Sequence, residues 1–98
     1  MPAVALIRRR VVLAEDAFAE FTVRRLPQPL APCRHHFKYR LAYVVAGRCV
    51  LRYDNESGKG DHRHLGAMQS RYRFTTPERL LAGFESDIAR WNREYSRP

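Results

Sequence analysis

The sequence contains few cysteines, few acidic residues and no long apolar segment. Its two cysteines, Cys33 and Cys49, form neither a disulfide framework nor a paired-cysteine metal motif. We expect both thiols to be reduced and structural, with Cys49 buried in a strand. Because no apolar run reaches about eighteen residues, a transmembrane helix is excluded. The N-terminal apolar run precedes its basic cluster, the reverse of a signal peptide, and we therefore expect a cytoplasmic protein.

The scarcity of acidic residues leaves an excess of positive charge. Ten Asp and Glu residues stand against 18 Lys and Arg, a net charge of +8. The excess is uneven: residues 1–53 carry ten basic and three acidic residues (net +7), and residues 54–98 carry eight and seven (net +1). A basic surface of this kind favours a polyanion or an acidic protein as partner, with solubility alone as the simpler alternative.

A chain of 98 residues with 45% apolar content has the size and composition of one small domain, residues 1–98. Several segments show the alternation of a half-buried strand. Three prolines within six residues mark 27–36 as a loop, since proline interrupts a central strand. We predict strands over residues 3–14, 18–26, 38–46, 49–54 and 68–74, with turns at 15–17 and 46–48.

Strand alternation also predicts which side chains share a face of the sheet. Within residues 18–26, Phe21 and Val23 face one side, and Glu20, Thr22 and Arg24 the other. In the strand predicted over 38–46, one face carries Tyr39, Leu41, Tyr43 and Val45. In the strand predicted over 49–54, one face carries Cys49, Leu51 and Tyr53, and the opposite face carries Val50, Arg52 and Asp54.

Residues 75–95 carry the clearest helical pattern. Thr75 with Glu78 fits a capping box, whereas Thr76 before Pro77 fits an N-cap with proline at the first helical position. Apolar residues recur at helical spacing and predict a face toward the core: Leu80, Leu81, Phe84, Ile88, Trp91 and Tyr95. Strands followed by a single helix indicate an α+β fold, an antiparallel sheet of about five strands with the C-terminal helix packed on it.

The most polar segment is YDNESGKGDHRH, residues 53–64. It holds three carboxylates, a lysine, an arginine, two histidines and two glycines. If residues 61–64 form a strand, His62 and His64 face one side, and Asp61 and Arg63 the other. If that strand pairs with 49–54, Asp54 lies opposite the histidines. We expect this hairpin to gather six groups in one small volume: Asp54, Lys59, Asp61, His62, Arg63 and His64.

Three interpretations fit this segment. In the first, histidines provide acid–base catalysis of RNA cleavage while basic side chains stabilise the phosphoryl charge. In the second, carboxylates and histidines bind a divalent metal, although the spacing matches no standard zinc pattern and Lys59 and Arg63 would repel a cation. In the third, the segment is a solvated connector. The nearby Cys33-Arg34-His35-His36 does not form a convincing metal site, but it would lie near a groove bordered by Lys38 and Arg40.

The signature Tyr53-Asp54-Asn55-Glu56 followed by Gly58-Lys59-Gly60-Asp61-His62-Arg63-His64 resembles the TumE family of toxin components from prokaryotic toxin–antitoxin systems. The pattern of Tyr72, Phe74, Leu80 or Leu81, Phe84 and Asp87 is also similar, and the resemblance covers about residues 37–92. It implies a small toxin encoded beside a helix-turn-helix antitoxin similar to TumA. Many small basic toxins of this size cleave mRNA, which is an analogy of system and size.

We therefore predict a growth-inhibiting endoribonuclease of a type II module that needs no metal or other cofactor. His62 and His64 form the predicted acid–base pair, Lys59 and Arg63 bind phosphate, and Asp54 and Asp61 orient the histidines. The predicted nucleic-acid-binding set is Arg63, Arg8, Arg9, Arg10, Arg24, Arg25 and Arg52. The alternative is a toxin that blocks a replication or translation component without chemistry. The assembly is expected to be a homodimer or a toxin–antitoxin hetero-oligomer.

Overall fold

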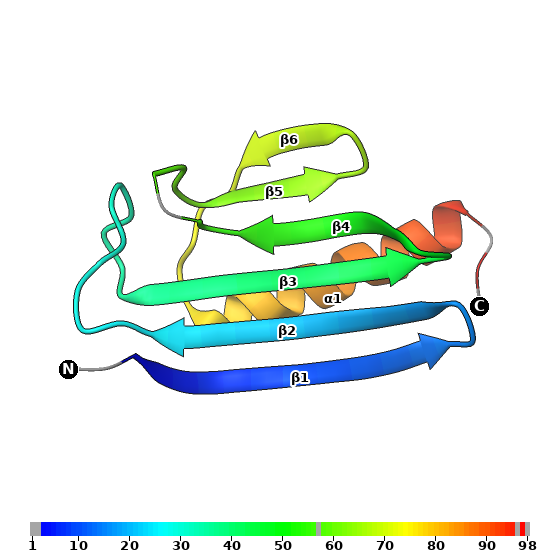
Figure 1. Ribbon diagram of the computed structural model, residues 1–98. Coiled ribbons are helices and arrows are strands. Elements are labelled where there is room, and N and C mark those ends of the chain that lie inside the picture. Colours follow the sequence, from blue (N-terminus) through cyan, green and yellow to red (C-terminus); the bar gives the residue numbers. More distant parts are fainter. Residues whose placement is uncertain (1–2, 57, 96, 98) are drawn as a thin grey trace.

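A computed structural model describes residues 3–56, 58–95 and 97 of the chain. Six antiparallel strands follow one another in sequence order across a single sheet, β1-β2-β3-β4-β5-β6, and one helix, α1, comes last (Figure 1). The bounds are β1 Val4–Ala14, β2 Ala17–Arg25, β3 Phe37–Val45, β4 Arg48–Asp54, β5 His62–Leu65, β6 Met68–Arg71 and α1 Pro77–Glu94. The α+β prediction is confirmed, with six strands in place of about five.

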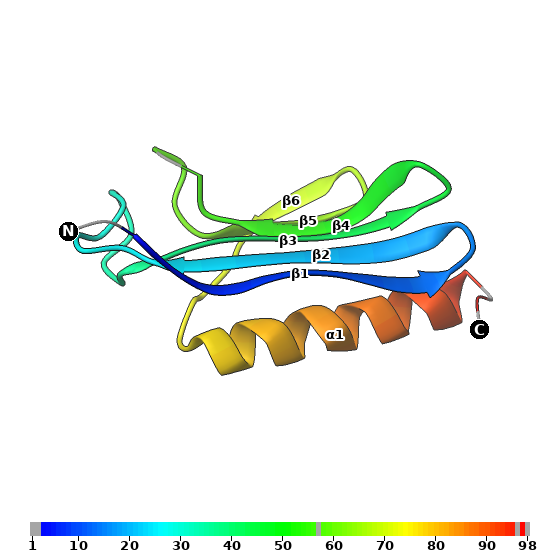
Figure 2. The same cartoon turned by 60° about the horizontal axis from the view of Figure 1, so that its bottom comes forward.

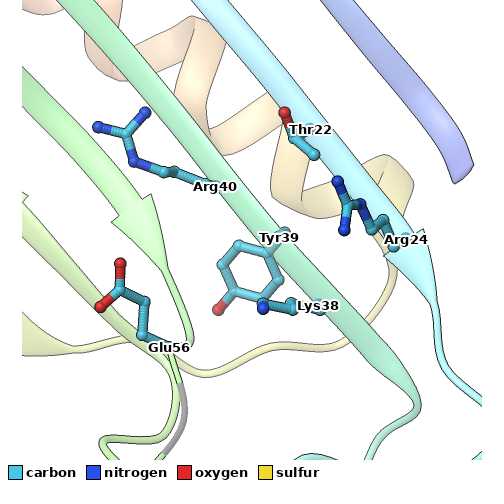
Figure 3. A pocket seen from close by; sticks show the side chains of 6 residues that line it. All are labelled: Thr22, Arg24, Lys38, Tyr39, Arg40 and Glu56. Atoms are coloured by element: carbon cyan, nitrogen blue, oxygen red, sulfur yellow. The ribbon is translucent and has the colours of Figure 1, made fainter. Parts of the chain in front are cut away.

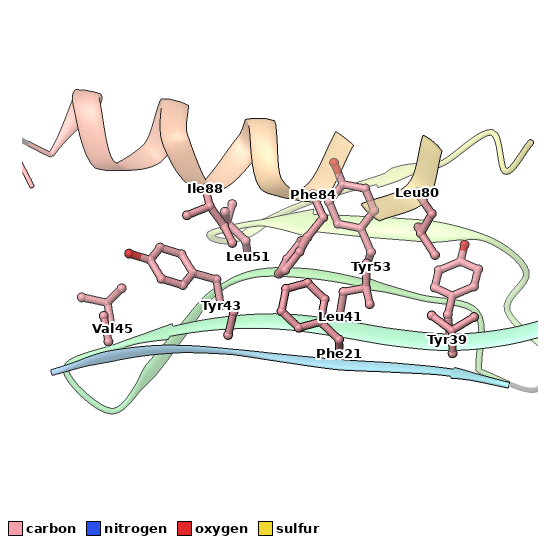
Figure 4. Packing of buried hydrophobic residues seen from close by; sticks show 13 residues of the cluster. Phe21, Tyr39, Leu41, Tyr43, Val45, Leu51, Tyr53, Leu80, Phe84 and Ile88 are labelled. Carbon is pink, nitrogen blue, oxygen red and sulfur yellow. The ribbon is translucent and has the colours of Figure 1, made fainter. Parts of the chain in front are cut away.

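The helix lies along one face of the sheet, and no second layer of the described residues covers the opposite face (Figure 2). The core sits between them. Alternate residues of β2, β3 and β4 point toward α1 and are buried, as the predicted alternation requires. Figure 4 shows Phe21, Leu41 and Tyr53 packed beneath Phe84 and Leu80 of the helix. No helix within the described residues is long and apolar enough to cross a membrane.

The N-terminus of α1 resolves the two capping alternatives. Thr76 is extended, and its hydroxyl accepts a hydrogen bond from the Arg79 amide at 3.1 Å, so Thr76 before Pro77 is the cap. Leu80, Phe84 and Ile88 are buried as predicted. Tyr95 is not a core residue: it ends the helix, is 63% exposed, and stacks on Trp91 with ring centroids 4.5 Å apart.

The prediction that Cys49 is buried beside Leu51 and Tyr53 is wrong. A register shift between Tyr43 and Val44 places Cys49 opposite Val44, so that Leu51 pairs with Tyr43 and Val50 is the extra residue of β4. The thiol of Cys49 is free and the residue is exposed. A bulge of this kind inverts side-chain direction on one side of it, and strict alternation cannot anticipate that.

Candidate functional site

The β4–β5 pairing assembles a polar cluster on the face of the sheet that α1 leaves uncovered. In this antiparallel ladder Asp54 lies opposite His62, and Arg52 lies opposite His64. The two strands are joined by the segment 55–61, which turns back at Gly58 and Gly60, both with positive φ. The predicted hairpin is confirmed, with β5 beginning at His62.

His62 is the buried member of this cluster, only 5% exposed. Its Nε2 lies 2.6 Å from Asp54 Oδ1, and its Nδ1 donates to the Gly60 carbonyl oxygen at 3.0 Å. Both ring nitrogens therefore face acceptor oxygens. Arg52 Nε approaches the other carboxylate oxygen at 2.8 Å. Asp54 thus lies between the His62 imidazole and the Arg52 guanidinium.

These ion pairs are close in distance but poorly aligned. Asp54 Oδ1 and Arg52 Nε are buried and have no hydrogen-bond partner of acceptable angle among the described residues. The groups are therefore close enough to pair, but the hydrogen bonds between them are weak. Buried polar atoms with incomplete hydrogen bonding are uncommon in folded proteins and occur at sites that rearrange or do chemistry.

His64 is chemically different from its neighbour. Arg52 Nη2 donates a hydrogen bond to His64 Nε2 at 2.9 Å, and because a guanidinium can only donate, that nitrogen must carry a lone pair. Burial, followed by the positive charges of Arg52 and His62, lowers the pKa of His64 below its ordinary value of 6.5. His64 is therefore neutral at pH 7, with an acceptor nitrogen held beside a guanidinium.

Two groups of described side chains have metal-ligating atoms within 4.8 Å of one another. The first is Asp54, His62 and His64. There the Arg52 guanidinium already contacts both the carboxylate and His64 Nε2, so a fixed positive charge occupies the position that a cation would take.

The second group is Cys33, His35 and Asp61. His35 Nδ1 accepts the Phe37 amide at 3.1 Å, so the hydrogen of a neutral ring is on Nε2, which donates to Asp61 at 2.8 Å instead of offering a lone pair. Burial also raises the pKa of the Cys33 thiol, which keeps it protonated. This group fits a hydrogen-bonded latch better than a metal site.

Asp61 and Arg63 lie on the opposite side of β5 from the histidines. Asp61 accepts hydrogen bonds from His35 and from the Tyr39 hydroxyl at 2.6 Å, and burial together with this bond raises the pKa of Tyr39. Arg63 points toward α1, with Nη1 3.6 Å from Asp87. The expectation that six groups share one small volume therefore fails for these two, because successive strand residues face opposite sides.

The helix side of Arg63 is itself a polar network. The Tyr53 hydroxyl donates to Asp87, and Arg90 contacts the same carboxylate. Burial and the bond to Asp87 raise the pKa of Tyr53 to about 12, so the hydroxyl remains a donor. This network joins β4 to α1, and it gives Arg63 a structural partner on the face away from His64.

The uncovered face, which we call the open face, carries two rows of side chains that cross all six strands and are polar except at the buried Ala42. Register places the first row as Arg8, Thr22, Arg40, Asp54, His62 and Arg71, and the second as Arg10, Glu20, Ala42, Arg52, His64 and Gln69. Neighbouring members of a row are about 5 Å apart, the spacing between strands. Both histidines thus lie in rows that also carry exposed arginines, with His62 itself buried.

A hollow of about 460 Å³ lies on the open face beside this cluster. Figure 3 shows Thr22 and Arg24 of β2 and Lys38 and Arg40 of β3 around it, with Glu56 across from them on the segment after β4. Lys38 and Arg40 border this hollow as expected, but its lining does not include residues 33–36, which were expected beside them. Lys59 is exposed, and its charge contributes to lowering the pKa of His64.

The predicted arginine set is divided between the two faces. Arg8, Arg10, Arg24 and Arg52 lie on the open face, whereas Arg9 pairs with Phe21, Arg25 pairs with Phe37, and Arg63 pairs with Tyr53, all on the side of α1. Sequence reasoning missed Arg71, which lies opposite His62. A hairpin over 62–71, indicated by Gly66, is the signal that would have placed it.

Comparison with known proteins gives one match, to a family model. No curated protein sequence and no solved structure matches the chain. One family model, described as Toxin TumE, matches residues 2–92 and thus includes the first 36 residues, for which the sequence pattern showed only a similar style. The chain belongs to the TumE family of toxins from toxin–antitoxin systems.

Proposed function

We propose that this toxin is a metal-independent endoribonuclease that acts in the cytoplasm and uses the open face to bind RNA. The observation that carries the proposal is the state of His64: a neutral imidazole, with its acceptor nitrogen on a guanidinium, within a basic face. A neutral histidine is the form that a general base requires. The guanidinium beside it suits a phosphate oxygen.

The basic rows supply the binding energy for a polyanion. Arg8, Arg10, Arg40 and Arg71 belong to rows that meet at the histidines, and the hollow bordered by Arg24 and Lys38 adjoins them. Lys and Arg contacts with phosphates bind without regard to base sequence and weaken as salt rises. RNA bound along a row would pass over His64.

The reaction follows from the groups at this position. A substrate phosphate draws the Arg52 guanidinium from His64, whose Nε2 then takes the proton of a ribose 2′-hydroxyl. The 2′-oxygen attacks the adjacent phosphorus, the bond from phosphorus to the 5′-oxygen breaks, and Lys59 gives a proton to the departing oxygen. The products are a 2′,3′-cyclic phosphate and a 5′-hydroxyl. Arg52 remains on the phosphoryl oxygens and stabilises their growing charge.

His62 has a positioning role in this proposal. It is almost fully buried, and both of its ring nitrogens face acceptors. Together with Asp54 it fixes Arg52, which in turn sets the tautomer of His64. Asp61, which latches to Tyr39 on the other side of the strand, positions the segment that carries Lys59.

A toxin of this kind has an antitoxin, and we infer that the partner is a helix-turn-helix protein similar to TumA. The family supports an antitoxin in general, and the helix-turn-helix class rests on the sequence resemblance described above. Such a partner would neutralise the basic face and repress the operon.

The test uses purified chain and end-labelled single-stranded RNA. The wild type should leave 2′,3′-cyclic phosphate ends in the presence of excess EDTA, while His64→Gln should lose about 10²–10⁴ in rate, the usual contribution of a general base. His36→Gln, an exposed histidine outside the cluster, is the matched control and should retain activity. Cleavage of RNA that is fully 2′-O-methylated would overturn the mechanism, as would full activity of His64→Gln.

A second function is favoured by one observation: Asp54 and His62 are buried and His64 Nε2 is occupied, which suits a rigid binding surface. In this alternative the open face blocks a nucleic-acid-bound replication or translation component without cutting RNA. Transcripts that remain intact during growth arrest, with arrest retained by His64→Gln, would favour it.

A further inference from the structure

The edge of the sheet at β1 is long and unpaired on its outer side. β1 has 11 residues and pairs with β2 alone among the described strands, whereas the opposite edge strand, β6, has four residues. An exposed edge presents a row of backbone donors and acceptors to any extended chain, and proteins usually shorten or cover such edges. A free edge of this length needs an explanation.

The side chains of β1 form three blocks. Arg8, Arg9 and Arg10 stand at the centre, all exposed, and none has a carboxylate within ion-pair distance in residues 3–56, 58–95 and 97. Two of them lie over aromatic rings, Arg10 3.8 Å from the Phe18 centroid and Arg9 5.7 Å from that of Phe21. Apolar residues flank this centre on both sides. Four of the six exposed large apolar residues of the described chain are here: Val4, Leu6, Val12 and Leu13.

Hollows lie on both faces of the sheet at this edge. On the open face a basic hollow of about 410 Å³ is lined by Arg8, Arg10 and Arg24. Between β1 and α1 a largely apolar hollow of about 250 Å³ is lined by Val11, Leu13 and Ile88. Arg9 and Phe21 line both, so the two hollows meet at the centre of the strand. A strand added here would place alternate side chains into them.

A second copy of this chain does not suit the edge. Two copies of β1 paired antiparallel about Arg9 would set Arg9 against Arg9 and Arg8 against Arg10, and like charges directly opposite destabilise a strand pair. An extended segment with the complementary order, apolar, then acidic, then apolar, matches all three blocks. Each acidic side chain would meet an arginine that has no carboxylate partner among the described residues.

We propose that the β1 edge is a docking site for an extended protein segment with an acidic centre and apolar flanks, which adds to the sheet as a seventh strand. Backbone pairing along β1 provides affinity, and the blocks of charge and apolar side chains fix the register. The partner expected to carry such a segment is the antitoxin. Docking needs no RNA chemistry, but if the open face binds RNA, an acidic strand beside Arg8 and Arg10 would also compete for it.

The experiment titrates the full chain with a labelled peptide of 11 residues, the length of β1, with glutamates at the centre and alternating valine and threonine at both ends. Binding is followed by fluorescence anisotropy and by amide NMR shifts. We expect saturable binding with the largest shifts in β1, and loss of about tenfold or more in affinity for Arg9→Glu. Arg48→Glu, an exposed arginine at the start of β4, is the matched control and should bind like the wild type.

Leu13→Ser, which removes an apolar contact without changing charge, gives a second variant, and circular dichroism confirms that each variant is folded. Equal affinity for the designed peptide and for a scrambled peptide of the same composition would overturn the proposal. So would β1 shifts that appear with a single-stranded RNA and not with the peptide, because the edge would then belong to the RNA surface. RNA cleavage plays no part in this readout, so its absence leaves the result intact.

Discussion

Replacement of Asp54 by asparagine tests whether the buried charge cluster is as coupled as its geometry indicates. Asp54 is 1% exposed and contacts His62 Nε2 at 2.6 Å and Arg52 Nε at 2.8 Å. Asparagine has nearly the same shape but is neutral. It keeps one acceptor and turns a donor toward a group that also donates, so Arg52 and His62 lose the carboxylate that lies between them.

The magnitude follows from burial. Removing one partner of a fully buried ion pair costs about 3–5 kcal/mol, because an uncompensated charge remains. The side chain of Arg52 is 34% exposed, so water screens part of its loss. The approach angles are also poor for hydrogen bonds. We therefore expect Asp54→Asn to lower the free energy of unfolding by about 2–4 kcal/mol, where each kcal/mol shifts Tm by about 4–8 °C in a domain of this size.

The assay is urea unfolding followed by tryptophan fluorescence and circular dichroism, with coincident transitions as the check on two-state behaviour. Asp16→Asn is the matched control. The Asp16 side chain is 48% exposed and pairs with Arg97, and loss of this ion pair should leave the urea midpoint nearly unchanged. If Asp54→Asn unfolds at the same urea concentration as the control, the contacts of Asp54 with His62 and Arg52 do not stabilise the fold, and the positioning roles given to His62 and Arg52 fail with them.

Three further outcomes are expected. Because the pKa of His64 is lowered in the folded state, the folded protein binds fewer protons than the unfolded chain as pH falls through about 6.5. The stability advantage of wild type over His64→Gln, present above that pH, should therefore shrink on acidification in urea titrations. An advantage that stays constant with pH would contradict the lowered pKa. Lys59→Arg keeps the positive charge but cannot give up a proton, so it should retain RNA affinity in gel-shift assays and lose about 10²–10⁴ in cleavage rate. The control Lys38→Arg should change neither affinity nor rate. Cleavage by Lys59→Arg at the wild-type rate would exclude Lys59 as the acid. Tyr39→Phe removes the hydroxyl bonded to Asp61 and should lower the free energy of unfolding by about 1–2 kcal/mol in the urea assay. The control Tyr95→Phe, at an exposed position, should leave the free energy of unfolding unchanged. Equal urea midpoints for the two variants would show that the hydrogen bond between Tyr39 and Asp61 contributes nothing to stability.

The sequence by itself determined the α+β architecture, the core and the place of the polar hairpin. These depend on local periods: alternation along β2 and β3, helical spacing of Leu80, Phe84 and Ile88, and a capping threonine. Such patterns are properties of neighbouring residues, so one chain suffices to recognise them. The pairing of Asp54 with His62 was also within reach, because two strands joined by a short glycine-containing turn have few registers available.

The tertiary structure alone decided which charges act together. Strand alternation predicted that Asp61 faces away from His62. Only the packed loop shows that His35 and Tyr39 donate hydrogen bonds to Asp61 on that side. The Arg52–His64 contact and the burial of His62 depend on side-chain packing across strands, and the Cys49 position depends on a one-residue bulge. Long-range contacts of this kind set protonation, and protonation decides which of two adjacent histidines is available to accept a proton.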